Sequence, residues 1–181
     1  MDELLTQFEE MLATSCSRVG REYFQLPIAD ADAVYRERVY CYELYHQMRS
    51  GWGEFGFSLG GEVDKMGHPH FEDGPYANAK PDFLVHQPGK MGHNLACVEV
   101  KPLNRPMASF IMDLRKLTWF CNHADYHRGI FLVYGTPGNG GAAGLRNELR
   151  GAVQNAQNID LGRIHVFFHP AELQRCERIN L

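Results

Sequence analysis

The chain has 181 residues, of which 44% are hydrophobic and 22% are charged, and its formal net charge is −4. This composition is typical of one soluble globular domain, while the acidic balance argues against a protein that coats nucleic acid through an overall positive field. No apolar run reaches the roughly 20 residues of a membrane span, and the acidic start, Met1-Asp2-Glu3, lacks the pattern of a signal peptide. Five scattered cysteines without a CxxC pair indicate reduced, buried thiols. We therefore expect a cytoplasmic protein without a membrane partner.

The first part of the chain predicts two helices followed by a strand region. Apolar residues between Leu4 and Leu12 repeat with helical spacing, and Gly20 offers a stop. A second helix is predicted over 32–49, and because its apolar residues are spread around its circumference, we expect it to be covered on more than one side. Residues 55–63 are aromatic and rich in glycine, which favours a bent strand or a hairpin.

Strands and helices alternate in the rest of the chain. The strand over 94–101 is the most regular, and the almost wholly apolar strand over 129–134 is typical of a sheet covered on both faces. The complete set predicted here is a strand over 81–86, a strand over 94–101, a helix over 107–122, a strand over 129–134, a helix over 145–154, a strand over 163–168 and a short helix begun by Pro170. This order predicts a mixed-sheet α/β sandwich.

Two acidic residues and a lysine fall on the neighbouring strands over 81–86 and 94–101. Residues two apart on a strand share a face, so Glu99 and Lys101 project together, and a hairpin brings Asp82 beside them. Placing these charges in an apolar sheet costs free energy unless something binds there. The carboxylates of Asp82 and Glu99, with the carbonyl of Val100, suit Mg²⁺ or Mn²⁺, which lowers the pKa of a bound water. Lys101 would position or deprotonate that water, or neutralise charge on a reacting phosphate.

Pro81-Asp82 followed by Glu99-Val100-Lys101 resembles the PD-(D/E)xK nuclease superfamily. The core of that superfamily, the restriction-endonuclease-like fold, is a helix, three antiparallel strands, a helix and a strand. The predicted elements over 32–134 follow the same order, which makes 1–31 an N-terminal helical addition and 135–181 a C-terminal addition of strand and helix within a single domain. The resemblance implies a metal-dependent endonuclease, a hydrolase of phosphodiester bonds of nucleic acid with DNA favoured over RNA, which works as a homodimer or with a partner protein.

Other interpretations of the motif stay open. Asp82 can instead cap a turn, with Glu99 and Lys101 forming a solvated pair on an exposed strand, although the apolar neighbours of all three favour central strands. A chain with this fold can also be an inactive nucleic-acid-binding or regulatory module. A structural or interaction protein without any nucleic-acid role is the third alternative.

The resemblance further implies a carboxylate from the helix that precedes the sheet, as an additional metal ligand and catalytic group. Glu43 is the candidate, because it lies in the crowded second helix, where the alternative is a structural hydrogen bond to a tyrosine. Glu37 is the competitor, although its neighbours Arg36 and Arg38 indicate a wetter position.

Three further residues are accessory candidates. Glu62 reaches the same edge if its strand pairs with that of Asp82, and is otherwise an ordinary charge at a strand end. His86 shares the side of Asp82 by the period of two, and is otherwise a packed surface histidine. Lys116 can contact phosphate or form an ion pair with Asp113 three residues before it.

Two other motifs receive ordinary interpretations, and a set of basic residues is assigned to the nucleic acid. Five histidines without zinc-site spacing do not support a structural zinc: His68, His70, His93, His123 and His127. Residues 138–143 fit a GxGxxA dinucleotide pattern, but a flexible connection explains them better. The basic residues expected to contact phosphates are Arg36, Arg38, Arg49, Lys80, Lys90, Arg105 and Lys116.

Overall fold

The structure is a computed structural model that describes residues 1–62, 75–76, 79–90, 92–138 and 140–181. Its helices are α1 (Asp2–Cys16), α2 (Arg21–Phe24), α3 (Glu37–Ser50), α4 (Met107–His123), α5 (Gly141–Gln154) and the 3₁₀ turn η1 (Leu161–Arg163). Its strands are β1 (Leu26–Ile28), β2 (Ala31–Val34), β3 (Ser58–Gly61), β4 (Phe83–His86), β5 (Asn94–Pro102), β6 (Tyr126–Tyr134), β7 (Ile164–His169) and β8 (Glu177–Ile179).

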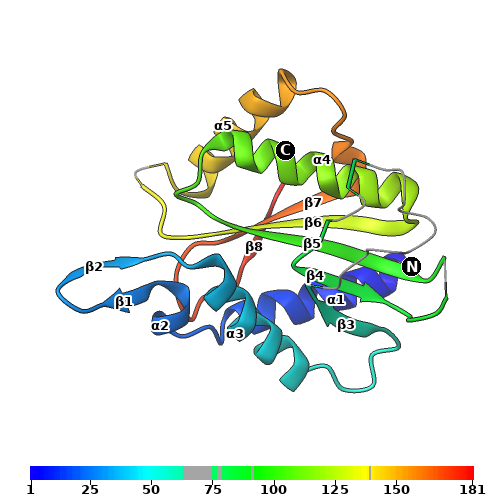
Figure 1. The fold of residues 1–181 in the computed structure, drawn as a ribbon, viewed down its shortest axis with the longest axis horizontal. Helices are drawn as coiled ribbons and strands as arrows, with labels where there is room; N and C mark the ends of the chain where they lie inside the picture. The colour runs from blue at the N-terminus through cyan, green and yellow to red at the C-terminus, as the bar shows by residue number, and fades with distance from the viewer. Residues whose placement is uncertain (63–74, 77–78, 91, 139) are drawn as a thin grey trace.

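A mixed sheet forms the centre of the molecule. Over the described residues it has six strands in the order β3-β4-β5-β6-β7-β8. The pairs β3–β4, β4–β5 and β7–β8 are antiparallel, whereas β5, β6 and β7 run parallel. Helices α1 and α3 cover one face, and α4 and α5 cover the other (Figure 1). The predicted mixed-sheet α/β sandwich is confirmed at this level. No helix in the described parts of the chain has the length and apolar character to cross a membrane.

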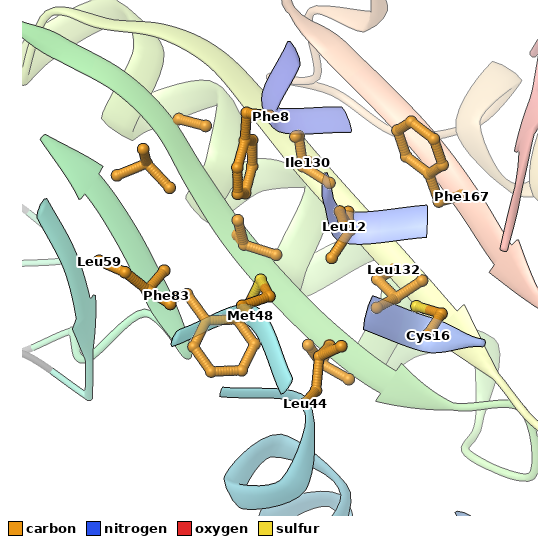
Figure 2. Close-up of a cluster of buried hydrophobic side chains, with 14 of the residues drawn as sticks. Phe8, Leu12, Cys16, Leu44, Met48, Leu59, Phe83, Ile130, Leu132 and Phe167 are labelled. Carbon is orange, nitrogen blue, oxygen red and sulfur yellow. The ribbon is translucent and has the colours of Figure 1, made fainter. Parts of the chain in front are cut away.

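Each face of the sheet has its own hydrophobic core. On the face of α1 and α3, side chains such as Phe8, Leu12 and Leu44 pack against Ile130 and Leu132 of β6 (Figure 2). The core on the other face joins α4 to the sheet through Cys97, Phe110, Leu114, Phe131 and Val133.

The alternation of side chains along β5 decides which face carries the charged residues. Val98 and Val100 belong to the core under α1 and α3, whereas Cys97 belongs to the core under α4. Since alternate residues of a strand point to opposite faces, Glu99 and Lys101 lie with Cys97 on the face of α4.

Two predicted boundaries in the first part of the chain are wrong. The second helix begins at Glu37 rather than residue 32, because Ala31–Val34 instead forms β2 and pairs with β1. Asp30, with φ of 59°, provides the left-handed turn of this hairpin. Of the strand region predicted over 55–63, only Ser58–Gly61 is a strand, and Val63 lies outside the described residues.

The C-terminal segment also differs from its prediction. Pro170 begins no helix; the chain turns instead, with Leu173 in the left-handed region and its N–H bonded to the carbonyl of Val19. Glu177–Ile179 then pairs with β7 as β8, which satisfies main-chain groups that the edge of β7 would leave open. Helix α5 begins at Gly141, four residues before its predicted start, and β6 begins three residues early.

Candidate functional site

The register of the sheet places Asp82 beside β5. Phe83 pairs with Val98, so one further step of the antiparallel register places Asp82 opposite Glu99. Asp82 Oδ2 accepts a hydrogen bond of 2.7 Å from the N–H of Val100. Because the N–H and C=O of one strand residue point to the same side, the Val100 carbonyl faces the same space as the Asp82 carboxylate.

Helix α4 supplies charged partners to both residues on β5. Lys116 Nζ lies 2.7 Å from Glu99 Oε2 and 3.5 Å from Asp113 Oδ1. Lys101 Nζ lies 3.1 Å from Asp113 Oδ2, an ion pair without hydrogen-bond geometry at that oxygen. Asp113 therefore lies between the two lysines and sets their separation across the face of the sheet.

Helix α3 contributes one further carboxylate, next to Lys101 near the end of β5. Glu37, its first residue, accepts a hydrogen bond of 3.0 Å from Lys101 Nζ. We call the resulting set the carboxylate–lysine cluster: Glu37, Asp82, Glu99, Lys101, Asp113 and Lys116. Four carboxylates and two ammonium groups give this cluster a formal charge of −2 when all are ionised.

The carboxylates at the centre of the cluster are held away from water. Glu99 is only 2% exposed, and its Oε1 is buried without a hydrogen-bond partner among the described residues. Burial, together with the charge of Asp82, raises the pKa of Glu99 well above its usual value. Burial and the charge of Glu37 raise the pKa of Asp82 to about 7, although the Val100 N–H and the two lysines oppose the shift. The raised pKa values mean that this site favours the uptake of a proton over keeping all four carboxylates ionised.

Both lysines stay protonated at neutral pH. Burial lowers the pKa of Lys101, but the carboxylates of Asp113 and Glu37 outweigh burial and leave the pKa above its ordinary value. For Lys116, burial likewise opposes and Glu99 dominates, so that its pKa is also raised. Lys101 is therefore a fixed positive charge rather than a ready proton acceptor.

The donor chemistry fits a hard divalent cation. No group of three or more His, Cys, Asp and Glu side chains converges as a metal site within the described parts of the chain. Mg²⁺ does not need such a cage, because it usually keeps several waters and binds one or two carboxylates together with substrate phosphates. The carboxylates of Asp82 and Glu99, the buried unpaired Oε1 of Glu99 and the carbonyl of Val100 match that requirement.

A cavity of about 320 Å³ opens next to Asp82 on the side of α3. Its lining residues are Cys41, Tyr42, Tyr45, Gly61, Glu62, Asp82 and Phe83. A small molecule or part of a polymer can therefore reach the Asp82 end of the cluster from outside.

The structure places the two candidate carboxylates of α3 differently. Glu43 accepts a hydrogen bond of 2.6 Å from Gln47, one turn further along the helix. Glu37 instead contacts Lys101, so it is the α3 carboxylate that joins the cluster. The signal was present in the sequence, because Glu37 lies four and seven residues before the buried Cys41 and Leu44 and hence on the same helical stripe.

The accessory candidates fall in different places. Glu62 follows β3, donates its N–H to the Asp82 carbonyl and pairs through its side chain with Arg38, 3.2 Å away. His86 ends β4, four residues and roughly 13 Å of strand from Asp82. Lys116 belongs to the cluster itself. The role of Asp113 as a shared partner of Lys101 and Lys116 was not predicted.

The histidines considered for zinc do not gather where they are described. His123 contacts the carbonyl of Trp119, and His127 pairs with Asp2, while His68 and His70 lie outside the described residues. Gly141 of the GxGxxA pattern begins α5, with residue 139 outside the described part. No protein-family model and no curated protein matches the chain.

Proposed function

We propose that the chain is a Mg²⁺- or Mn²⁺-dependent nuclease that hydrolyses phosphodiester bonds, with DNA favoured over RNA as substrate. The observation that carries this proposal is the buried pair of Asp82 and Glu99, with one carboxylate oxygen unpaired, next to the positive charge of Lys101. The element order α3, β3, β4, β5, α4, β6 supports the restriction-endonuclease-like core that the PD and ExK residues imply.

In this proposal, some residues of the cluster bind the metal and others stabilise charge on the substrate. Asp82, Glu99 and the carbonyl of Val100 would bind the metal, which lowers the pKa of a bound water and stabilises charge on the scissile phosphate. Lys116 holds one oxygen of Glu99 and leaves the other available. Lys101, kept protonated by Asp113 and Glu37, stabilises the developing negative charge on the phosphate rather than removing a proton from water.

The test is cleavage of labelled single- and double-stranded DNA and RNA with Mg²⁺, Mn²⁺ or a chelator. We expect metal-dependent cleavage that Asp82→Ala abolishes, while Asp32→Asn, an exposed control, leaves it unchanged. Gel filtration in parallel would test for the proposed homodimer. Cleavage that continues in the chelator, or in Asp82→Ala, would contradict the proposal.

A second candidate is a nuclease-fold protein that binds nucleic acid without cutting it. The ion pair of Lys116 with Glu99 favours this alternative, because an internal ammonium can neutralise the buried carboxylate without any metal. Such a protein would bind nucleic acid equally well in chelator and show no cleavage with either metal. It predicts further that Lys116→Met lowers stability without affecting any metal response.

A further inference from the structure

The cavity beside Asp82 has an aromatic wall. Tyr42 and Tyr45 come from α3, three residues apart and therefore on one side of the helix, and Phe83 comes from the start of β4. The volume of about 320 Å³ falls within the range of small-molecule sites. Flat apolar surfaces of this kind suit a planar ring system.

The inner part of this wall is fixed before anything binds. Tyr45 donates its hydroxyl to the carbonyl of Leu59, 3.3 Å away, and its ring stacks on that of Phe83 with centroids 6.3 Å apart. Phe83 is 2% exposed and cannot move without disturbing the core. A ligand ring would therefore meet a preorganised surface, which lowers the entropy cost of binding.

The outer part of the wall is an exposed aromatic side chain. Tyr42 is 60% exposed, although aromatic rings of this size usually contribute their area to a core or an interface. At the rim, Arg38 pairs with Glu62 at 3.2 Å and offsets the charge of that carboxylate.

We propose that this cavity binds an unpaired nucleobase adjacent to the phosphate held at Asp82, with Tyr42 as the stacking residue. The inference rests on the proposed function, since it takes Asp82 to mark the position of the scissile phosphate. Bases in a duplex are stacked and paired and do not present a free face to the cavity, whereas bases in a single strand do. The substrate segment at the site is therefore single-stranded.

The test measures binding in chelator, where no cleavage interferes, by fluorescence anisotropy with labelled oligo-dT, oligo-U and a blunt DNA duplex. We expect Tyr42→Ala to weaken binding of a single strand roughly 5- to 150-fold and binding of the duplex less than about twofold. Tyr42→Phe keeps the ring and should retain binding. Tyr23→Ala, which removes an exposed tyrosine of α2, is the matched control and should behave as the parent protein. Comparison of oligo-dT with oligo-U reports whether the sugar matters.

Several results would overturn this inference. They are equal weakening of single strand and duplex, an unchanged single-strand affinity in Tyr42→Ala, or no binding of any single strand by the parent. If the parent cleaves with metal but Tyr42→Ala binds single strands normally, the nuclease proposal stands and the base site fails. If nothing is cleaved while single-strand binding depends on Tyr42, the base site stands and the nuclease proposal fails.

Discussion

The carboxylate–lysine cluster and the pair formed by Tyr40 and His169 are both buried polar groups near the carboxyl ends of parallel strands, but they are built differently. Tyr40 Oη lies 2.8 Å from His169 Nδ1, and both residues are fully buried. Tyr134 stacks on Tyr40 with ring centroids 3.8 Å apart, and Phe24 packs edge-on to His169. Aromatic rings and the buried thiol of Cys16, whose Sγ lies 3.7 Å from Tyr40 Oη, surround this pair.

The cluster has the opposite character. It brings four carboxylates and two lysines together, leaves a buried oxygen of Glu99 unpaired, and adjoins a cavity at Asp82. Removing charge from water costs free energy, and an enclosed neutral hydrogen bond avoids most of that cost. The comparison teaches that the Tyr40 pair can stabilise the fold without a ligand, whereas the cluster, under the proposed function, lowers stability until a cation binds.

The pH dependence of stability should show the largest effect. Asp82 binds its proton more tightly in the folded protein, where its pKa is about 7, than in the unfolded chain, where it is near 3.8. The free energy of unfolding of metal-free protein should therefore fall as pH rises from about 4 to 7, by up to about 4 kcal/mol from Asp82 alone. Urea denaturation at pH 5 and pH 8 measures about 2.7 kcal/mol of this fall, and the fall should be smaller in Asp82→Asn. An equal fall in both proteins would contradict the assignment.

Removal of the fixed positive charge should affect the reaction almost as strongly. Lys101→Ala is expected to lower the single-turnover cleavage rate about 10²–10³-fold, because a preorganised donor to the transition state is lost. Nucleic-acid affinity in chelator should change little. Arg178→Ala, which removes an exposed positive charge on β8, is the control. A rate within tenfold of the parent would exclude the proposed role.

Metal binding should offset the loss of stability that the buried carboxylates of the cluster cause. At a Mg²⁺ or Mn²⁺ concentration of 100 Kd, the free energy of unfolding should increase by about 2.7 kcal/mol. The thermal shift should be greater at pH 8 than at pH 5, because protons compete with the metal for Asp82 and Glu99. Asp82→Asn should reduce the shift at pH 8. A shift of the same size at both pH values would indicate binding elsewhere.

The Tyr40 pair should respond in stability alone. Tyr40→Phe removes the hydroxyl partner of His169 Nδ1, while His169 Nε2 is already buried without a hydrogen-bond partner in the described structure. We expect a loss of about 1–3 kcal/mol in the free energy of unfolding. Cleavage per folded molecule should be unchanged, and Tyr23→Phe serves as the exposed control. If the cleavage rate of Tyr40→Phe falls more than its folded fraction does, the Tyr40 pair also contributes to the activity of the cluster.

The two carboxylates of α3 provide the smallest and most specific comparison. Glu37→Gln should lower the cleavage rate about tenfold, because it weakens an ion pair that positions Lys101. Glu43→Gln, on the same helix, should stay within about twofold because Glu43 contacts Gln47. The reverse ranking would restore Glu43 as the site residue of this helix.

Much of the sheet and its helices could be predicted because hydrophobic periodicity is a local property. The strand over 94–101 and the helix over 107–122 agree with β5 and α4 to within about one residue. The hairpin of β1 and β2 and the strand β8 were missed, because short pairings depend on partners rather than on periodicity. The period of two along β5 also placed Glu99 and Lys101 on one face.

The rest of the cluster needed the tertiary structure. Glu37 was readable from its helical stripe with Cys41 and Leu44, but its arginine neighbours argued for solvent. Asp113 and Lys116 could be recognised as an i, i+3 pair, yet nothing local indicated that α4 would place them against β5. Contacts between distant segments follow from packing, which one segment does not specify.

The hydrogen bond from Val100 to Asp82 lies where two neighbouring strands of the sheet differ in length. Strand β4 begins at Phe83, whereas β5 continues to Pro102, so the last residues of β5 extend past their antiparallel neighbour. Main-chain N–H and C=O groups of β5 that a longer β4 would bond are therefore open to other partners. The N–H of Val100 bonds to the side chain of Asp82, and other such groups can bond to a ligand. Because β5 continues four residues past Val98, the partner of Phe83, the point at which β4 begins is as decisive for this site as the identity of its acids.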